Sequence, residues 1–78
     1  MRFIVDNKLY DTDKATLIYS EYKIRNRRDY YKTHKGTYFV HYVSKGEIAI
    51  VSEEDIRDLL AIKDVDKYIE LFGIVDEG

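Results

Sequence analysis

The sequence predicts an α+β fold, in which a small antiparallel sheet of about five strands packs against two short C-terminal α-helices. β-branched and aromatic runs separated by turn residues fill positions 1–51, whereas apolar residues recur at helical spacing after Ser52. A chain of 78 residues without cysteine can form one hydrophobic core and no disulfide. We therefore expect a single domain over residues 1–78, with a β-rich basic part at 1–51 and an acidic helical part at 52–78.

The first predicted element is a hairpin with strands at residues 3–5 and 8–10. Asp6 and Asn7 between them tolerate the left-handed backbone of a tight turn. Residues 15–23 fit either a strand or one face of a helix, and the β-rich run at 16–19 favours the strand.

Residues 29–43 contain the clearest β pattern, with strands at 30–33 and 37–43. His34, Lys35 and Gly36 form the loop between them, with Gly36 at the position that needs a positive φ. This loop places Tyr31 opposite Phe39 and Asp29 opposite His41. A turn at 44–46 and a strand at 47–51 complete a three-stranded meander.

Two helices follow the last strand. Ser52, three residues before Asp55, predicts a capping box at the start of the first helix. Asp64 is the expected N-cap of the second helix and Gly73 its C-terminal residue, with Ile74 packing back onto the last turn. The apolar positions of the two helices are Ile56, Leu59, Leu60, Val65, Tyr68, Ile69 and Phe72.

Charge is distributed unevenly along the chain. Residues 1–46 carry ten Lys and Arg against five Asp and Glu, a net charge of +5, and residues 47–78 carry three against ten, a net charge of −7, which sum to the formal −2. The basic half includes a cluster beside an aromatic residue, a pattern typical of nucleic-acid binding. The pI near 5.6 is low for that class, however, and a charged loop is the stronger explanation of the cluster. The candidate nucleic-acid residues are Lys23, Arg25, Arg27, Arg28 and Tyr30.

The sequence contains no motif that indicates catalysis and no segment that indicates a membrane protein. Ser20, Ser44 and Ser52 lie in no nucleophile motif, and the four glycines stand singly and form no phosphate-binding loop. No apolar run reaches the roughly 18–20 residues of a transmembrane helix. We therefore expect a cytoplasmic binding protein and not an enzyme.

A metal site is the remaining chemical possibility. Imidazole nitrogens and carboxylate oxygens are ligands that zinc accepts, and zinc can stabilise a small domain that has no cysteine. The candidate ligands are His41, His34 and Asp29, with Asp11, Asp13 or a partner chain as further sources. The alternative is that His41 and Asp29 form an ordinary cross-strand hydrogen bond.

Four segments together resemble a group of small proteins from phages and prophages of Gram-positive bacteria. These are residues 9–15, residues 31–39, the capped helix at 52–60, and residues 68–73. Within this group, the chain is similar to streptococcal anti-CRISPR proteins that inhibit the type II RNA-guided DNA endonuclease. Since the shared motifs are turns, caps and hydrophobic anchors, the resemblance carries over a class of activity but no matched ligand positions.

The resemblance implies a non-enzymatic inhibitor that binds this nuclease in the bacterial host cytoplasm and blocks the loading of target DNA. The nuclease has basic channels for nucleic acid, so an acidic surface would be attracted to it. The candidate partner-binding residues are Glu53, Glu54, Asp55, Asp58, Asp64, Asp66 and Glu70. The alternatives are a small nucleic-acid-binding phage regulator and an oligomeric structural module, with a homodimer as its simplest form.

Overall fold

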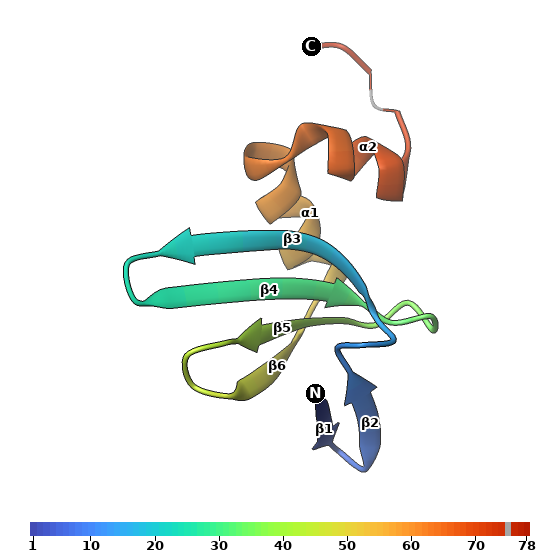
Figure 1. The fold of residues 1–78 in the computed structure, drawn as a ribbon. Helices are drawn as coiled ribbons and strands as arrows, with labels where there is room; N and C mark the ends of the chain where they lie inside the picture. Colours follow the sequence, from blue (N-terminus) through green and yellow to red (C-terminus); the bar gives the residue numbers. More distant parts are fainter. Residues whose placement is uncertain (75) are drawn as a thin grey trace.

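The computed structural model describes residues 1–74 and 76–78. It has six strands and two helices, so the predicted α+β class is confirmed (Figure 1). The strands are β1 (Arg2–Val5), β2 (Lys8–Asp11), β3 (Thr16–Lys23), β4 (Asn26–Lys32), β5 (Tyr38–Tyr42) and β6 (Glu47–Val51). The helices are α1 (Glu53–Lys63) and α2 (Val65–Phe72).

A four-stranded antiparallel sheet in the order β3-β4-β5-β6 forms the centre of the fold. The predicted register of β4 against β5 is confirmed, since Tyr31 lies opposite Phe39 and Asp29 opposite His41. Gly36 in the connecting loop has a φ of 90°, a value that residues with a Cβ rarely adopt. The strand interpretation of residues 15–23 is also correct, because β3 covers Thr16–Lys23.

The first hairpin does not join the central sheet, contrary to the prediction of one sheet of about five strands. Within the described part of the chain, β1 and β2 pair only with each other. The backbone N–H of Ala15 donates to the carbonyl of Asp11 at 3.0 Å, and this turn separates β2 from β3. The hairpin instead packs on the face of β5, where its Phe3 ring lies 5.3 Å from the His41 ring and its Tyr10 ring lies 5.4 Å from the Phe39 ring.

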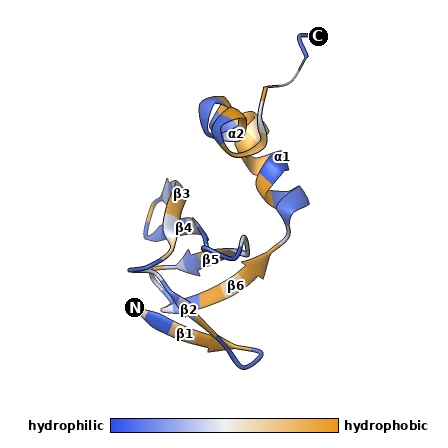
Figure 2. Cartoon of the chain, turned by 90° about the vertical axis from the view of Figure 1, so that its right-hand side faces the viewer, coloured by the Kyte–Doolittle hydropathy of each residue, from blue (hydrophilic) through white to orange (hydrophobic). Residues whose placement is uncertain are grey.

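The central sheet is therefore covered on both faces, with the hairpin below and the helices above (Figures 1 and 2). Neighbouring residues of a strand point to opposite faces. Phe39 accordingly packs against the hairpin, while Tyr38 packs against α2, with its ring 6.4 Å from that of Phe72. Burial on both faces explains why β5 is almost wholly buried.

The helical layer begins as predicted and buries one stripe of α1. Ser52 Oγ accepts a hydrogen bond from the backbone N–H of Asp55 at 3.1 Å, and Asp64 caps α2 through the N–H of Lys67 at 3.1 Å. Ile56 and Leu60 have no exposed surface and pack with Ile18 and Tyr38 in one core cluster. Hydrophobic burial thus fixes α1 on the sheet.

Two local expectations are wrong. Ile74 does not pack onto the last turn of α2, because 90% of it is exposed. The basic cluster is not a loop either, because β3 ends at Lys23 and β4 already begins at Asn26. Ile24 and Arg25 form the two-residue turn between them, with Arg25 at a φ of 60°.

Neither helix is long and apolar enough to cross a membrane, within the residues that the structure describes.

Candidate functional site

The predicted pair of Asp29 and His41 lies at the centre of the sheet. The two residues are opposite each other on β4 and β5, and their exposed fractions are only 5% and 6%. Among the residues that the structure describes, they are the two buried positions with an ionisable acidic or basic side chain. Burying a carboxylate is costly unless it is hydrogen-bonded, so its partners decide its role.

One carboxylate oxygen of Asp29 is hydrogen-bonded by neighbours on its own face of the sheet. Its Oδ1 accepts hydrogen bonds from Ser20 Oγ at 2.8 Å and from Arg27 Nε at 2.9 Å. The hydrogen bond to Asp29 raises the pKa of Arg27 above its ordinary value. The Ser20 contact links β3 to β4, and the two contacts together give Asp29 a structural role.

His41 packs as an apolar ring. Its Nε2 is buried without a hydrogen-bond partner in the described structure, and the ring lies against Phe3. Burial lowers the pKa of His41 and the nearby Asp29 charge opposes this effect only in part, so the ring is neutral near pH 7. The expected hydrogen bond between His41 and Asp29 is wrong, since the carboxylate bonds Ser20 and Arg27 instead.

The candidate zinc ligands are not gathered into one group among the residues that the structure describes. Nowhere in residues 1–74 and 76–78 do three or more His, Asp or Glu side chains come together as a metal site would require. His34 lies in the exposed β4–β5 loop, outside the buried pair of Asp29 and His41. Asp11 uses one carboxylate oxygen to accept the N–H of Asp13 at 2.9 Å. The chemistry of the buried pair is therefore that of a packed and hydrogen-bonded core.

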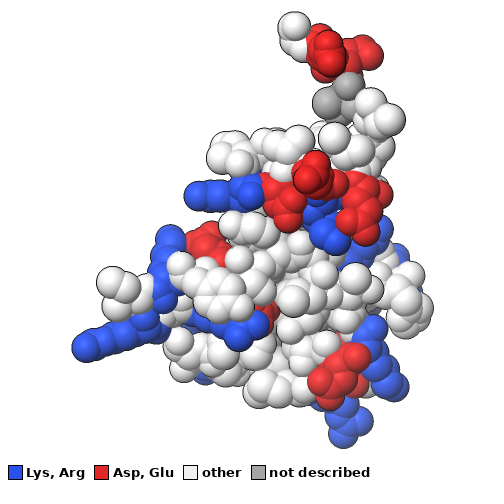
Figure 3. Space-filling view, turned by 45° about the horizontal axis from the view of Figure 1, so that its top comes forward, with Lys and Arg blue, Asp and Glu red and all other residues white. Residues whose placement is uncertain are grey.

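The candidate acidic residues lie on the helical layer (Figure 3). All except the half-buried cap Asp64 are exposed. Glu53 is paired with Arg57 at 3.4 Å and Glu70 with Lys67 at 2.9 Å. Among the six exposed candidates, the four that form no ion pair with any described residue are Glu54, Asp55, Asp58 and Asp66.

The candidate nucleic-acid residues do not form one surface. Arg27 shares a face with Asp29, whereas Arg28 and Tyr30 alternate onto the helical face, where Tyr30 packs against the core. Only Lys23 and Arg25 lie at the tip of the β3–β4 hairpin, beside Ile24.

Sequence reasoning missed a cavity between the first hairpin and the β4–β5 loop. It is lined by residues of β2, of the turn at 14–15 and of the loop, including Lys8, Lys14, His34 and Lys35. These positions are up to 27 residues apart in sequence, from Lys8 to Lys35, and share no motif. The only feature of the sequence that could have indicated this cavity is that all of these residues belong to the basic half of the chain.

Searches of protein-family models, curated proteins and solved structures found no significant match to this chain.

Proposed function

We propose that this protein is a non-enzymatic inhibitor that binds a type II CRISPR RNA-guided DNA endonuclease in the cytoplasm of a bacterial host. The observation that carries the proposal is the set of exposed acidic side chains on α1 and α2 that have no ion-pair partner in the described structure, Glu54, Asp55, Asp58 and Asp66. Carboxylates that no basic neighbour neutralises are free to attract a basic partner.

The arrangement of these acids supports a docking role. Glu54 and Asp58 are four residues apart on α1 and so share one side of that helix. The helix is fixed by its buried Ile56 and Leu60, which makes the acidic side a rigid surface. Such a surface is complementary to the positively charged channel that holds nucleic acid in the nuclease, and steering would speed their association.

The proposal is tested with purified nuclease loaded with guide RNA. We expect the protein to co-elute with this complex and to inhibit cleavage stoichiometrically, with the Glu54→Lys/Asp58→Lys variant about tenfold weaker because two attractive charges become repulsive. Glu47→Lys/Glu77→Lys is the matched control, since it makes the same charge change at exposed positions away from that side of α1. Unimpaired cleavage at excess protein, without co-elution, would reject the proposal for that nuclease.

The β3–β4 hairpin favours a second candidate function, nucleic-acid binding by a small regulator. Its tip projects from the sheet (Figure 1) and presents Ile24, which is 95% exposed, between the basic side chains of Lys23 and Arg25. Tyr22 beside the tip is 70% exposed and can stack on a base. Cations flanking exposed apolar and aromatic groups suit a phosphate backbone with accessible bases.

A gel-shift series at increasing salt tests this candidate. We expect binding that weakens steeply with salt and is lost in Lys23→Glu/Arg25→Glu, because phosphate contacts release counterions. Lys45→Glu/Lys63→Glu is the control with equal charge change at exposed positions outside the hairpin tip. An equal loss in both variants would mean that net charge alone drives the binding.

A further inference from the structure

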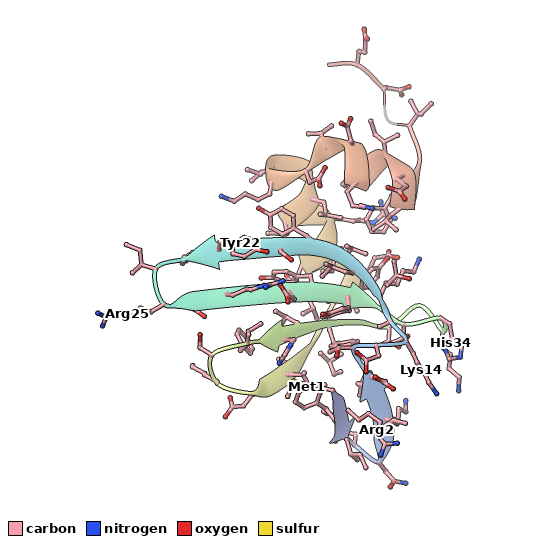
Figure 4. The ribbon with its side chains drawn as sticks, in the orientation of Figure 1. Met1, Arg2, Lys14, Tyr22, Arg25 and His34 are labelled. Carbon is pink, nitrogen blue, oxygen red and sulfur yellow. The ribbon has the colours of Figure 1, made fainter. Side chains whose placement is uncertain are left out.

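The cavity between the first hairpin and the β4–β5 loop has a volume of about 540 Å³. This volume is within the range of roughly 300–1,000 Å³ that small-molecule sites occupy. One wall is formed by β2 and the turn at Lys14 and Ala15, and the other by Thr33, Lys35 and their loop neighbours. Figure 4 shows Lys14 and His34 close together at the same edge of the molecule, on segments that the fold brings side by side.

The walls of the cavity are held in place by packing and hydrogen bonds. Tyr10 of β2 is buried against Phe39, with the two rings 5.4 Å apart, which fixes the hairpin on the sheet. On the other side, the backbone N–H of Thr33 donates to the carbonyl of Thr37 at 2.8 Å, and the N–H of Thr37 donates to Thr33 Oγ1 at 3.1 Å. The cavity is therefore largely formed before any ligand binds.

Its charge is strongly positive for a protein whose net charge is −2. Lys8, Lys14 and Lys35 all line it, and none of them forms an ion pair with a residue that the structure describes. Asp11 is the one carboxylate among the lining residues, and one of its oxygens accepts the N–H of Asp13. Three lysines around one cavity, with a histidine beside them, form a site for an anion of more than one charge.

Part of the lining is apolar. Leu9, Tyr10 and Ala15 contribute to the cavity, and its exposed surface is more apolar than polar. If the ligand were an inorganic anion, the apolar part of the lining would stay in contact with water. The ligand that matches both parts has a phosphate group at the lysines and a ring system against the apolar residues.

We propose that this cavity binds a small phosphorylated molecule with an attached ring system, the chemistry of a free nucleotide. The lysine ammonium groups bind the phosphates, and the hydroxyl groups of Thr33 and Thr37 are available as additional donors. A phosphodiester within a nucleic-acid strand carries the same groups. The volume of about 540 Å³ matches one small molecule, so a single nucleotide is favoured over a strand. This site is separate from the acidic helical surface and does not depend on nuclease binding.

Calorimetric titration of the full chain at low salt tests the proposal, with ADP, inorganic pyrophosphate, adenosine and an eight-nucleotide single strand as probes. We expect saturable binding of ADP at one site, weaker binding of pyrophosphate and no detectable binding of adenosine, because both charge and ring contribute. The variant Lys14→Glu/Lys35→Glu should bind ADP at least about tenfold more weakly.

Lys45→Glu/Lys63→Glu, which changes the net charge equally outside the cavity, should bind ADP within about twofold of the wild type. Melting curves of both variants establish that they remain folded. Three results would overturn the proposal: no ADP binding at millimolar concentration, an equal loss in both variants, or binding of the strand without binding of ADP. Since the readout is ligand binding, the result is independent of any failure to inhibit a nuclease.

Discussion

Phe39→Ala is expected to lower the free energy of unfolding by about 3–5 kcal/mol, enough to leave much of the protein unfolded at room temperature. Phe39 has no exposed surface. Its ring stacks on Tyr31 at 5.1 Å between centroids and meets the edge of Tyr10 at 5.4 Å. Truncation would remove one of the two ring contacts that hold the first hairpin on the sheet and leave a cavity that a small core cannot refill.

Urea unfolding followed by circular dichroism measures this loss. Ile62→Ala is the control, because Ile62 is 81% exposed on α1 and its truncation should change stability by less than about 0.5 kcal/mol. A Phe39→Ala variant as stable as the control would show that the hairpin is not packed on β5 as described.

Asp29→Ala is expected to have the second largest effect, a loss of about 1–3 kcal/mol. The substitution removes the acceptor of Ser20 Oγ at 2.8 Å and of Arg27 Nε at 2.9 Å, in a position that is only 5% exposed. The hydroxyl of Ser20 would then lie partly buried without its partner. Thermal and urea unfolding at constant pH measure the change.

Asp29→Asn separates the hydrogen bonds from the charge. The amide oxygen still accepts a hydrogen bond, so this variant should recover part of the stability that alanine loses. If Asp29→Ala and Ser20→Ala were additive in the double variant, the two side chains would not be coupled, and the structural role of Asp29 would be contradicted.

Local sequence signals predicted most elements of the fold correctly. The loop at His34, Lys35 and Gly36 determines the β4–β5 register, because a glycine at positive φ and a short loop allow few alternatives. Ser52 and Asp64 were identified as caps because a side-chain oxygen one turn before an apolar stripe is a local pattern.

The β3–β4 hairpin was missed because its turn has no glycine. Arg25 adopts a φ of 60°, a conformation that arginine rarely takes. The sequence around it contains no turn motif that would predict this conformation. Seven cross-strand pairs between β3 and β4 stabilise this turn from outside it. The basic cluster, for which the sequence predicts a loop, therefore includes Arg27 and Arg28, which lie on opposite faces of β4.

The α+β class, the meander register and the helix caps could be predicted from the amino-acid pattern, since these depend on residues close together in the chain. The packing of the first hairpin on the second face of the sheet, where it buries Phe39 and His41, became evident only from the three-dimensional fold. It likewise decided that Asp29 bonds Ser20 and Arg27, and that three distant lysines share one cavity. The physical reason is that burial and electrostatic attraction depend on distance in space, whereas local patterns report only distance along the chain.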